Sequence, residues 1–194
     1  MSWHFFQHFA TNWKDTGAIA PSSPALARRM IKCARIATAA SVLELGPGTG
    51  AFTCEIERAL PSGAHYLGLE LNQSFVDRLR RQHPRMQFEA VAAQDFDFDK
   101  VLGHDGSFDA IVSGLPWTNF PEWLQIAILD HVLPRLRPGG VFVTFAYTGF
   151  HLLPKGQHFR TLLRGRCLEL NTSRTVWANL PPAFVYEAVA GKDH

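Results

Sequence analysis

One stretch decides the fold of this 194-residue chain: Val42-Leu43-Glu44-Leu45-Gly46-Pro47-Gly48-Thr49-Gly50. Its first residues are mainly apolar and predict a short buried strand, and the apolar spacing over residues 52–60 is typical of a helix. The glycines between them allow a sharp turn, because glycine tolerates positive φ and has no Cβ to keep a ligand away. In open parallel sheets, ligands bind beyond the carboxyl ends of the strands. The stretch therefore predicts an α/β fold with a nucleotide-like cofactor at Gly46, Gly48 and Gly50.

Glu44 discriminates between two possible cofactors. Gly46, Gly48 and Ala51 also fit the loose dinucleotide fingerprint, with Glu70 at about the expected distance, so NAD is an alternative. A carboxylate just before the loop repels a pyrophosphate, but it attracts a cation such as the ammonium group of S-adenosylmethionine (SAM). The pattern E-L-G-x-G-x-G resembles motif I of the class I SAM-dependent methyltransferases. The stretch therefore favours SAM over NAD.

Composition indicates one α/β domain without a strong overall attraction for polyanions. The net charge is +2 and 19% of the residues are charged, although basic residues gather locally in 28–35, 78–85 and 160–166. The 3 cysteines are scattered, which fits a reducing cytoplasm without structural disulfides. No apolar run reaches the roughly 18 residues that span a bilayer, and no signal peptide is recognisable. We expect a single domain over residues 1–194 that is cytoplasmic and either soluble or peripheral.

The first 23 residues are unusually aromatic. On a helix, one face would carry the following side chains: Trp3, Phe6, Ala10 and Trp13. This segment is interpreted either as an anchor at a membrane surface or as a lid packed on the domain itself, and periodicity alone does not separate the two. His4 and His8 have helical spacing, but no third ligand accompanies them, so no metal site is expected.

The rest of the chain alternates between predicted strands and helices. Strands are expected at residues 42–45, 65–69, 86–91, 108–113, 141–147, 167–177 and 183–190. Helices are expected at residues 24–37, 52–60, 121–136 and 158–163, with a further helix capped by Asn72 or Ser74. This order predicts a Rossmann-like α/β fold and resembles the methyltransferase sheet, which has seven mostly parallel strands of which the last is reversed.

Further cofactor contacts are predicted at the ends of the next strands. Glu70, followed by Leu71, is placed to accept hydrogen bonds from ribose hydroxyls. Asp95 and Phe96 stand where class I methyltransferases hold the adenine amino group and ring, although Asp95 also fits an ordinary acidic loop. Ser113, at the end of the fourth strand, completes the predicted cofactor set.

The substrate is expected beside the turn Gly114-Leu115-Pro116-Trp117. Amino-directed methyltransferases carry Asn or Asp, any residue, Pro and an aromatic residue here, because the nitrogen must be aimed at the methyl carbon. Gly114 lacks the side-chain acceptor that orients a nucleobase amine, whereas Trp117 can offer its ring to an alkylammonium group. A structural turn with a buried Trp117 is the alternative. Tyr147, at the end of the fifth strand, is a candidate for contacting the amine by position alone.

Four stretches resemble bacterial phospholipid N-methyltransferases of the PmtA type. They are F-F-Q-H-F-A-T-N-W-K-D-T-G-A-I-A-P-S-S (5–23), E-L-G-P-G-T-G (44–50), S-G-L-P-W (113–117) and V-W-A-N-L-P-P-A-F-V-Y (176–186). The resemblance implies methyl transfer from SAM to phosphatidylethanolamine and its mono- and dimethyl derivatives, leading to phosphatidylcholine. It also implies peripheral binding to an anionic surface, the inner face of the inner membrane.

Three other functions remain as hypotheses. A more distant resemblance to ribosomal RNA adenine dimethyltransferases suggests a nucleic-acid N-methyltransferase, which Gly114 disfavours, so no nucleic-acid partner is expected. A SAM-binding module without turnover and an NAD-dependent oxidoreductase are the other two.

Overall fold

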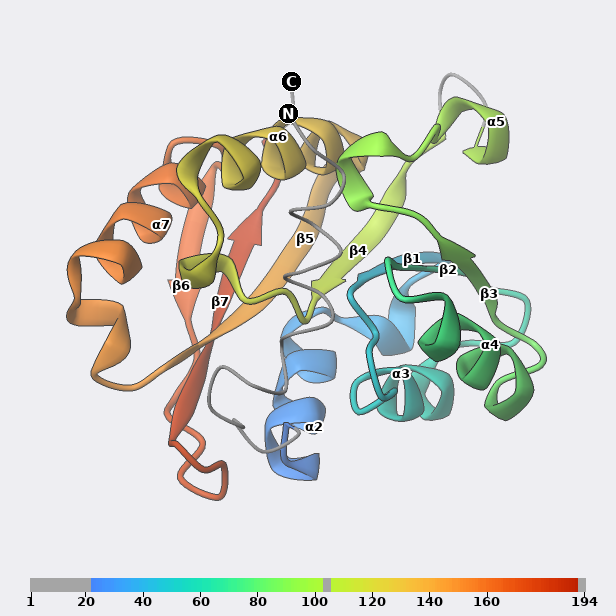
Figure 1. Cartoon of the computed structure of the whole chain (residues 1–194), viewed down its shortest axis with the longest axis horizontal. Coiled ribbons are helices and arrows are strands. Elements are labelled where there is room, and N and C mark those ends of the chain that lie inside the picture. The colour runs from blue at the N-terminus through green and yellow to red at the C-terminus, as the bar shows by residue number, and fades with distance from the viewer. Residues whose placement is uncertain (1–21, 103–105, 192–194) are drawn as a thin grey trace.

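A computed structural model describes residues 22–102 and 106–191 of the chain (Figure 1). The strands are β1 (Ser41–Leu45), β2 (His65–Glu70), β3 (Gln87–Ala90), β4 (Phe108–Ser113), β5 (Leu136–Tyr147), β6 (Glu169–Thr172) and β7 (Ala183–Val189). The helices are α2 (Pro24–Cys33), α3 (Thr53–Ala59), α4 (Gln73–Gln82), α5 (Asp99–Leu102), α6 (Glu122–Val132) and α7 (Pro154–Arg164). The aromatic segment predicted for residues 1–23 lies outside this description, apart from its last two residues.

All described strands belong to one sheet with the order β3-β2-β1-β4-β5-β7-β6. Strands β1 to β5 run parallel to one another, and β7 runs antiparallel to both β5 and β6. The order in which the strands are added to the sheet reverses between β1 and β4, so the crevice where ligands of such sheets bind lies beyond the carboxyl ends of these two strands. The predicted Rossmann-like sheet with a reversed last strand is confirmed.

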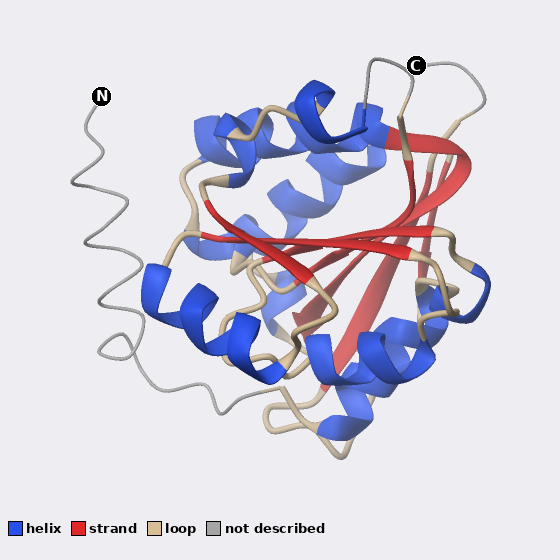
Figure 2. Cartoon of the chain, turned by 90° about the vertical axis from the view of Figure 1, so that its right-hand side faces the viewer, coloured by secondary structure: helices blue, strands red, loops and turns tan. Residues whose placement is uncertain are grey.

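The sheet separates two apolar cores, and helices cover both of its faces (Figure 2). On one face, α2, α3 and α4 bury side chains such as Met30, Ile56 and Leu79. On the other, α6 and α7 bury side chains such as Ile128 and Leu163. Successive side chains of a strand point to opposite faces, so a central strand must be apolar in both directions. Glu44 is the exception in β1, and it is buried on the side of α2 to α4.

Caps set the helix starts that the sequence predicted. The Ser23 hydroxyl oxygen accepts a hydrogen bond from Leu26 N–H at 3.2 Å, and the Asn72 side chain accepts one from Ser74 N–H at 2.9 Å. Each cap satisfies a backbone donor that has no partner inside the helix. The residues that precede α2 are also tied to the far end of the chain, because Ser23 N–H donates to Asn179 Oδ1 at 2.9 Å.

Several predicted boundaries were wrong by part of an element. The first helix ends at Cys33 rather than 37, and Arg35 follows it with a left-handed φ of 56° before a short 3-10 turn. The helix predicted to reach residue 136 changes to a 3-10 turn at Leu133, because Pro134 cannot donate a hydrogen bond. The predicted strand 167–177 shortens to β6, after which Ser173 N–H donates to Val185 O and an isolated bridge joins Val176 to Ala183.

Within residues 22–102 and 106–191, no helix combines the length and the apolar character that crossing a bilayer requires.

Truncating a core side chain of β1 should destabilise the whole sheet. Leu43 is fully buried, whereas Leu168 is 66% exposed. We expect Leu43→Ala to lower the free energy of unfolding by about 2–5 kcal/mol, since it removes buried methyl groups and leaves a cavity. The control Leu168→Ala should change it by less than about 0.5 kcal/mol. Urea unfolding followed by circular dichroism measures both values, and equal effects would contradict this packing.

Candidate cofactor and substrate site

The glycine loop joins β1 to α3 at the carboxyl edge of the sheet. Gly46, Gly48 and Gly50 have φ values of +68°, +57° and +90°, which residues with a side chain rarely adopt. A Cβ on Gly46 would lie 2.7 Å from Leu115 Cδ2, whereas a Cβ on Gly48 would meet nothing closer than 3.9 Å. Gly46 is therefore required for packing, and Gly48 leaves its backbone open to a ligand.

Glu44 is fully buried, and one of its two oxygens is held by hydroxyl groups. Oε2 accepts hydrogen bonds from Thr53 Oγ1 at 2.9 Å and from Tyr66 OH at 2.5 Å. Oε1 has no hydrogen-bond partner among the described residues although it is buried. A buried acceptor without a partner is costly, so Oε1 is suited to a donor from a bound ligand. The amino group of SAM is such a donor.

Burial changes the acidity of this cluster. Loss of hydration raises the pKa of Glu44 from 4.5 to about 7, against the opposing effect of the hydrogen bonds from Tyr66 and Thr53. Burial, and then the nearby Glu44, raise the pKa of the Tyr66 hydroxyl well above 10, so Tyr66 remains a donor at neutral pH. A cation close to Oε1 would favour the ionised carboxylate and lower the pKa of Glu44.

Glu70 connects the second strand to the glycine loop. Its Oε2 accepts a hydrogen bond from Gly48 N–H at 3.0 Å, and its Oε1 accepts one from Asn72 N–H at 2.9 Å. Burial raises the pKa of Glu70, and these backbone donors oppose that shift. Each carboxylate oxygen can accept more than one hydrogen bond, so the group retains capacity for ribose hydroxyls. Leu71 follows it and is half-buried.

Asp95 and Phe96 lie after β3. Asp95 ends the 3-10 turn Ala93–Asp95 and is exposed, and its Oδ2 accepts a hydrogen bond from Gln94 at 3.3 Å. The half-buried Phe96 ring packs against Phe98, with ring centroids 4.9 Å apart. An exposed carboxylate beside an apolar ring is compatible with an adenine amino group and its ring, and the adenine role of this pair remains a prediction.

The turn after β4 is built around Ser113 and Trp117, whose side chains were predicted to contact the cofactor and the substrate. Ser113 is fully buried, and its Oγ accepts hydrogen bonds from Trp117 Nε1 at 3.1 Å and Leu115 N–H at 3.3 Å. Trp117 is 3% exposed, and its ring stacks on Phe159 at 5.0 Å. Both side chains are used inside the protein. The geometry therefore supports the alternative of a structural turn with a buried Trp117, rather than a Trp117 ring presented to an amine.

Gly114 brings this turn against the glycine loop. Its N–H donates to Leu45 O at 2.8 Å. A Cβ at this position would lie 2.9 Å from Gly46 O and 3.4 Å from the ring of Phe52. The Asn or Asp that amino-directed methyltransferases carry here therefore does not fit this backbone without a shift. The carbonyl oxygens of Leu115 and Pro116 accept hydrogen bonds from Trp117 N–H at 3.0 Å and Asn119 N–H at 2.9 Å, and the substrate contact of these two residues remains a prediction.

Tyr147 stands at the end of β5 within a row of aromatic rings. Phe52 contacts Phe145 with centroids 5.9 Å apart, Phe145 contacts Tyr147 at 5.5 Å, and Tyr147 contacts Phe150 at 6.2 Å. Burial raises the pKa of Tyr147 above its usual 10, so its phenol is neutral at physiological pH. Tyr147 therefore suits contact with a substrate amine and does not suit the role of a base.

The sequence alone did not identify the residues that orient the predicted groups. Tyr66 and Thr53 hold Glu44, and Gln125 Nε2 donates to Trp117 O and Phe120 O at 2.9 and 3.0 Å. A glycine within the predicted second strand was the one sequence feature that could have indicated the contact of Tyr66 with Glu44. Gly68, two residues later in β2, faces Glu44 in the register, and a Cβ there would lie 2.8 Å from Tyr66 OH.

The Glu44 carboxyl should make stability depend on pH. Its pKa is 4.5 in the unfolded chain and about 7 in the fold, so between these values only the folded state binds the proton. The free energy of unfolding should therefore fall as pH rises from 4.5 to 7, with a contribution on the order of 3 kcal/mol from this group. Glu44→Gln should remove that contribution, because the amide does not titrate.

Urea unfolding of the ligand-free protein across this pH range measures the effect. The exposed Glu169 provides a control, and Glu169→Gln should retain the pH dependence of the original protein. The same pH dependence in Glu44→Gln and in the original protein would contradict the assignment.

A methyl group at position 114 should weaken cofactor binding. Gly114→Ala places a Cβ against Gly46 O and displaces the glycine loop, and we expect at least about a tenfold loss of SAM affinity, since small displacements in such sites are costly. Gly165→Ala is the matched control, because its Cβ would meet nothing closer than 3.6 Å. Isothermal titration calorimetry compares the two, and equal SAM affinity in both variants would refute the close approach.

Comparisons with known proteins agree with this geometry. Residues 42–140 match the family model described as a methyltransferase domain. An ornithine lipid N-methyltransferase from Singulisphaera acidiphila is 30% identical over 178 residues, which cover 80% of this chain and 91% of that protein. A ribosomal RNA small subunit methyltransferase A from Cupriavidus taiwanensis is 40% identical, but only over 77 residues, which cover 39% of this chain and 26% of that protein.

A solved structure supports the fold. The O-methyltransferase from Bacillus cereus, crystallised in complex with SAH, superposes with a TM-score of 0.69 at 17% identity and covers 97% of this chain and 91% of that one. The glycine loop, the unpartnered Glu44 oxygen and the acidic end of β2 fit the cofactor that this family uses. The chain thus belongs to the class I SAM-dependent methyltransferases, and its cofactor is SAM.

Proposed function

We propose that this enzyme transfers methyl groups from SAM to the amine of phosphatidylethanolamine and of its mono- and dimethyl derivatives, leading to phosphatidylcholine, at the inner membrane surface. The observation that carries the proposal is the relative named as an ornithine lipid N-methyltransferase, because the alignment covers 91% of that protein. The sequence resemblance to phospholipid N-methyltransferases, at residues 5–23 and 176–186, supports phosphatidylethanolamine as the lipid substrate.

Gly114 supports an alkylamine over a nucleobase. A flat exocyclic amine is weakly basic and needs a side-chain acceptor that orients its N–H groups, and position 114 has no side chain. Because a Cβ would lie 2.9 Å from Gly46 O, the backbone leaves no room for one. A flexible alkylamine carries a localised lone pair and depends less on such an acceptor. The ribosomal RNA relatives make nucleic acid the second candidate, over a much smaller shared length.

The residues near the cofactor loop have two tasks in this reaction. SAM supplies a methyl group that its sulfonium already activates, so the protein must orient the amine and exclude water. A free alkylamine has a pKa of about 10.4 and is protonated at neutral pH, so its proton must be lost before methylation. Loss of hydration as the amine leaves water disfavours its charged form and thereby lowers its pKa.

The rings of Phe52, Phe145 and Tyr147 suit the methylated product. A quaternary ammonium group cannot lose its charge, and aromatic faces stabilise such a cation within about 6 Å. In this proposal Tyr147 contacts the lipid amine, and the backbone at Leu115 and Pro116 holds its N–H groups. Glu44 Oε1 accepts the cofactor ammonium, Glu70 with Leu71 the ribose, and Asp95 with Phe96 the adenine.

Lipid analysis in cells that lack phosphatidylcholine tests the proposal. Expression of this protein should produce mono-, di- and trimethylated phosphatidylethanolamine, detected by mass spectrometry as successive mass increases of the headgroup. Gly46→Ala should reduce all three to background, because its φ of +68° is strained for alanine and its Cβ meets Leu115.

Two parallel measurements identify a wrong substrate. Methylated ornithine lipid without methylated phosphatidylethanolamine would show a different lipid amine. Transfer of labelled methyl groups from SAM to RNA, with none to lipid, would establish the nucleic-acid alternative. SAM binding without transfer to lipid amines or RNA would indicate a binding module.

A further inference from the structure

The large exposed apolar side chains of the described residues concentrate on two segments at one edge of the sheet. The first segment, residues 148–153, follows β5, and the second, residues 173–182, precedes β7. They contribute the following exposed side chains: Phe150 at 58%, Leu152 at 64%, Leu153 at 54%, Trp177 at 76% and Leu180 at 80%. We call these five residues the apolar rim. Such a concentration indicates an interaction surface rather than the scattered apolar residues of an ordinary surface.

The two segments are neighbours in space. Thr148 N–H donates to Pro182 O at 2.8 Å, and Tyr147 pairs with Ala183 across the β5–β7 ladder. His151 packs its ring against Phe184 with centroids 4.8 Å apart. In Figure 1 both segments lie along the lower edge of the molecule, where β5 ends and β7 begins. The apolar rim is therefore one surface formed by two distant parts of the sequence.

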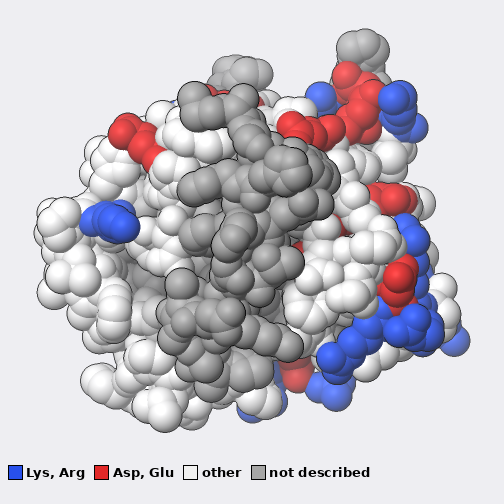
Figure 3. All heavy atoms as spheres, in the orientation of Figure 1, with Lys and Arg blue, Asp and Glu red and all other residues white. Residues whose placement is uncertain are grey.

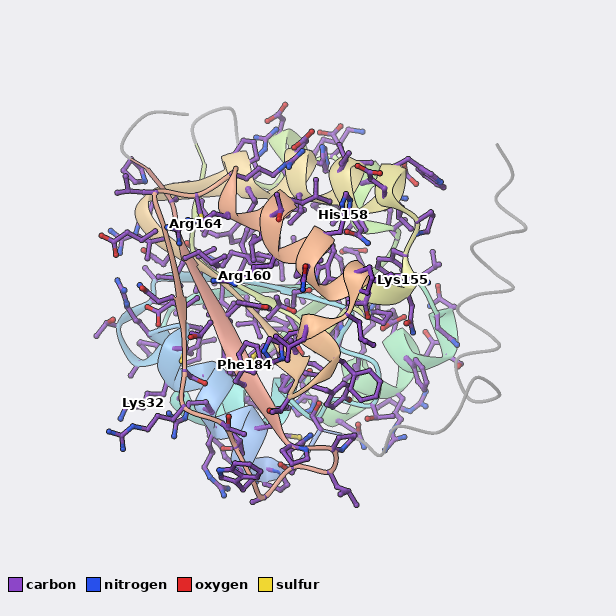
Figure 4. All side chains as sticks on the ribbon, turned by 90° about the vertical axis from the view of Figure 1, so that its left-hand side faces the viewer. Lys32, Lys155, His158, Arg160, Arg164 and Phe184 are labelled. Atoms are coloured by element: carbon purple, nitrogen blue, oxygen red, sulfur yellow. The ribbon has the colours of Figure 1, made fainter. Side chains whose placement is uncertain are left out.

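The two segments and α7 between them carry basic side chains and no acidic ones, although Glu122 of α6 contacts His158 of α7. The sequence has no Asp or Glu from Thr148 to Leu168 or from Leu170 to Tyr186, while Lys155 and Arg174 are exposed there. In the space-filling view, the lower left of the molecule is mostly uncharged, with neither red nor blue atoms over most of it (Figure 3). Lys155, Arg160 and Arg164 follow one another along α7 (Figure 4). An apolar surface with basic residues such as Lys155 and Arg174 beside it complements a bilayer that contains anionic lipids.

The apolar rim is connected to the cofactor loop by the aromatic row. Phe52 lies beside Gly114, and ring contacts continue through Phe145 and Tyr147 to Phe150, which belongs to the rim. The rim and the cofactor loop are thus joined by one continuous set of apolar side chains. This continuity associates the rim with the lipid-methylating site and not with an unrelated partner.

From these observations we infer that the apolar rim is the surface by which the protein docks on an anionic bilayer, with Trp177, Leu180 and Phe150 inserted among the lipids. This inference deepens the proposed function and rests on it for its biological purpose. The docked orientation places the carboxyl edge of the sheet, and with it the methyl-transfer site, toward the headgroups. Exposed Trp and Leu side chains bind at this depth because their apolar parts leave water there.

Cosedimentation with vesicles tests the docking surface using two exposed leucines at opposite edges of the sheet. Leu180 belongs to the rim, whereas Leu168, 66% exposed, donates its N–H to Val189 O at the other end of β7. With vesicles of phosphatidylcholine and phosphatidylglycerol in equal parts, we expect Trp177→Ser/Leu180→Ser to reduce binding at least about tenfold, given the apolar area involved. Leu168→Ser should bind like the original protein.

The vesicle composition separates this inference from the proposed function. These vesicles lack phosphatidylethanolamine, so binding that depends on the rim supports docking even if lipid methylation is never found. Arg174→Gln should weaken binding to them and leave binding to vesicles of pure phosphatidylcholine nearly unchanged.

Three outcomes would overturn the inference. They are equal vesicle binding by the rim variant and Leu168→Ser, no binding of the original protein, and a dimer that the rim variant abolishes while vesicle binding persists. Unfolding temperatures of both variants should match that of the original protein, because the replaced side chains are exposed.

Discussion

The close approach of two glycines underlies the architecture of the site. Gly46 follows β1 and Gly114 follows β4, and the two turns touch because neither residue has a Cβ. Gly114 N–H donates to Leu45 O at 2.8 Å, and Gly46 N–H donates to Leu69 O at 2.9 Å, so backbone hydrogen bonds join the ends of three adjacent strands. The glycine loop and the turn after β4 are consequently joined into one unit, and their relative position is set by backbone contacts rather than by flexible side chains.

Within this unit the protein keeps an ionisable group in an apolar environment. Burying a carboxyl group is unfavourable unless it is hydrogen-bonded, and Tyr66 and Thr53 satisfy only one oxygen of Glu44. The other oxygen provides a place where a cationic ligand gains more than it would in water, because charges interact strongly when they are desolvated. A destabilising feature of the ligand-free fold is therefore suited to cofactor recognition, as expected where functional sites depart from the best local packing.

The aromatic row gives the proposed lipid reaction a physical basis. Its rings form a continuous apolar contact between the cofactor loop and the exposed rim. In the proposed reaction, their faces would stabilise the quaternary ammonium product. Trp117, whose ring the sequence suggested for contact with the substrate amine, is buried and stacks on Phe159. In the proposed function, the aromatic contact with the substrate amine is instead provided by the row Phe52, Phe145 and Tyr147, whose residues come from two separate parts of the chain.

The sequence by itself determined the main order of strands and helices, the glycine loop after β1 and the acidic residues near the ends of β1 and β2. These features are local, because glycine spacing and apolar periodicity act over a few residues, and the chain order of β/α units restricts the sheet to very few topologies. Element ends were less predictable, as at Cys33 and Leu133, where competing turns decide the last hydrogen bonds.

Only the tertiary structure decided which side chains meet. Trp117 is buried because α7, far along the chain, provides Phe159 as a stacking partner, and its Nε1 donates to Ser113 Oγ. No local sequence pattern predicts a contact between such distant residues. Tyr66 reached Glu44 because the register of β1 and β2 opposes Gly68 to it, and the apolar rim formed because β5 and β7 are antiparallel neighbours. Contacts between distant segments depend on strand pairing and packing, so the identity of the site followed from sequence while its geometry followed from the fold.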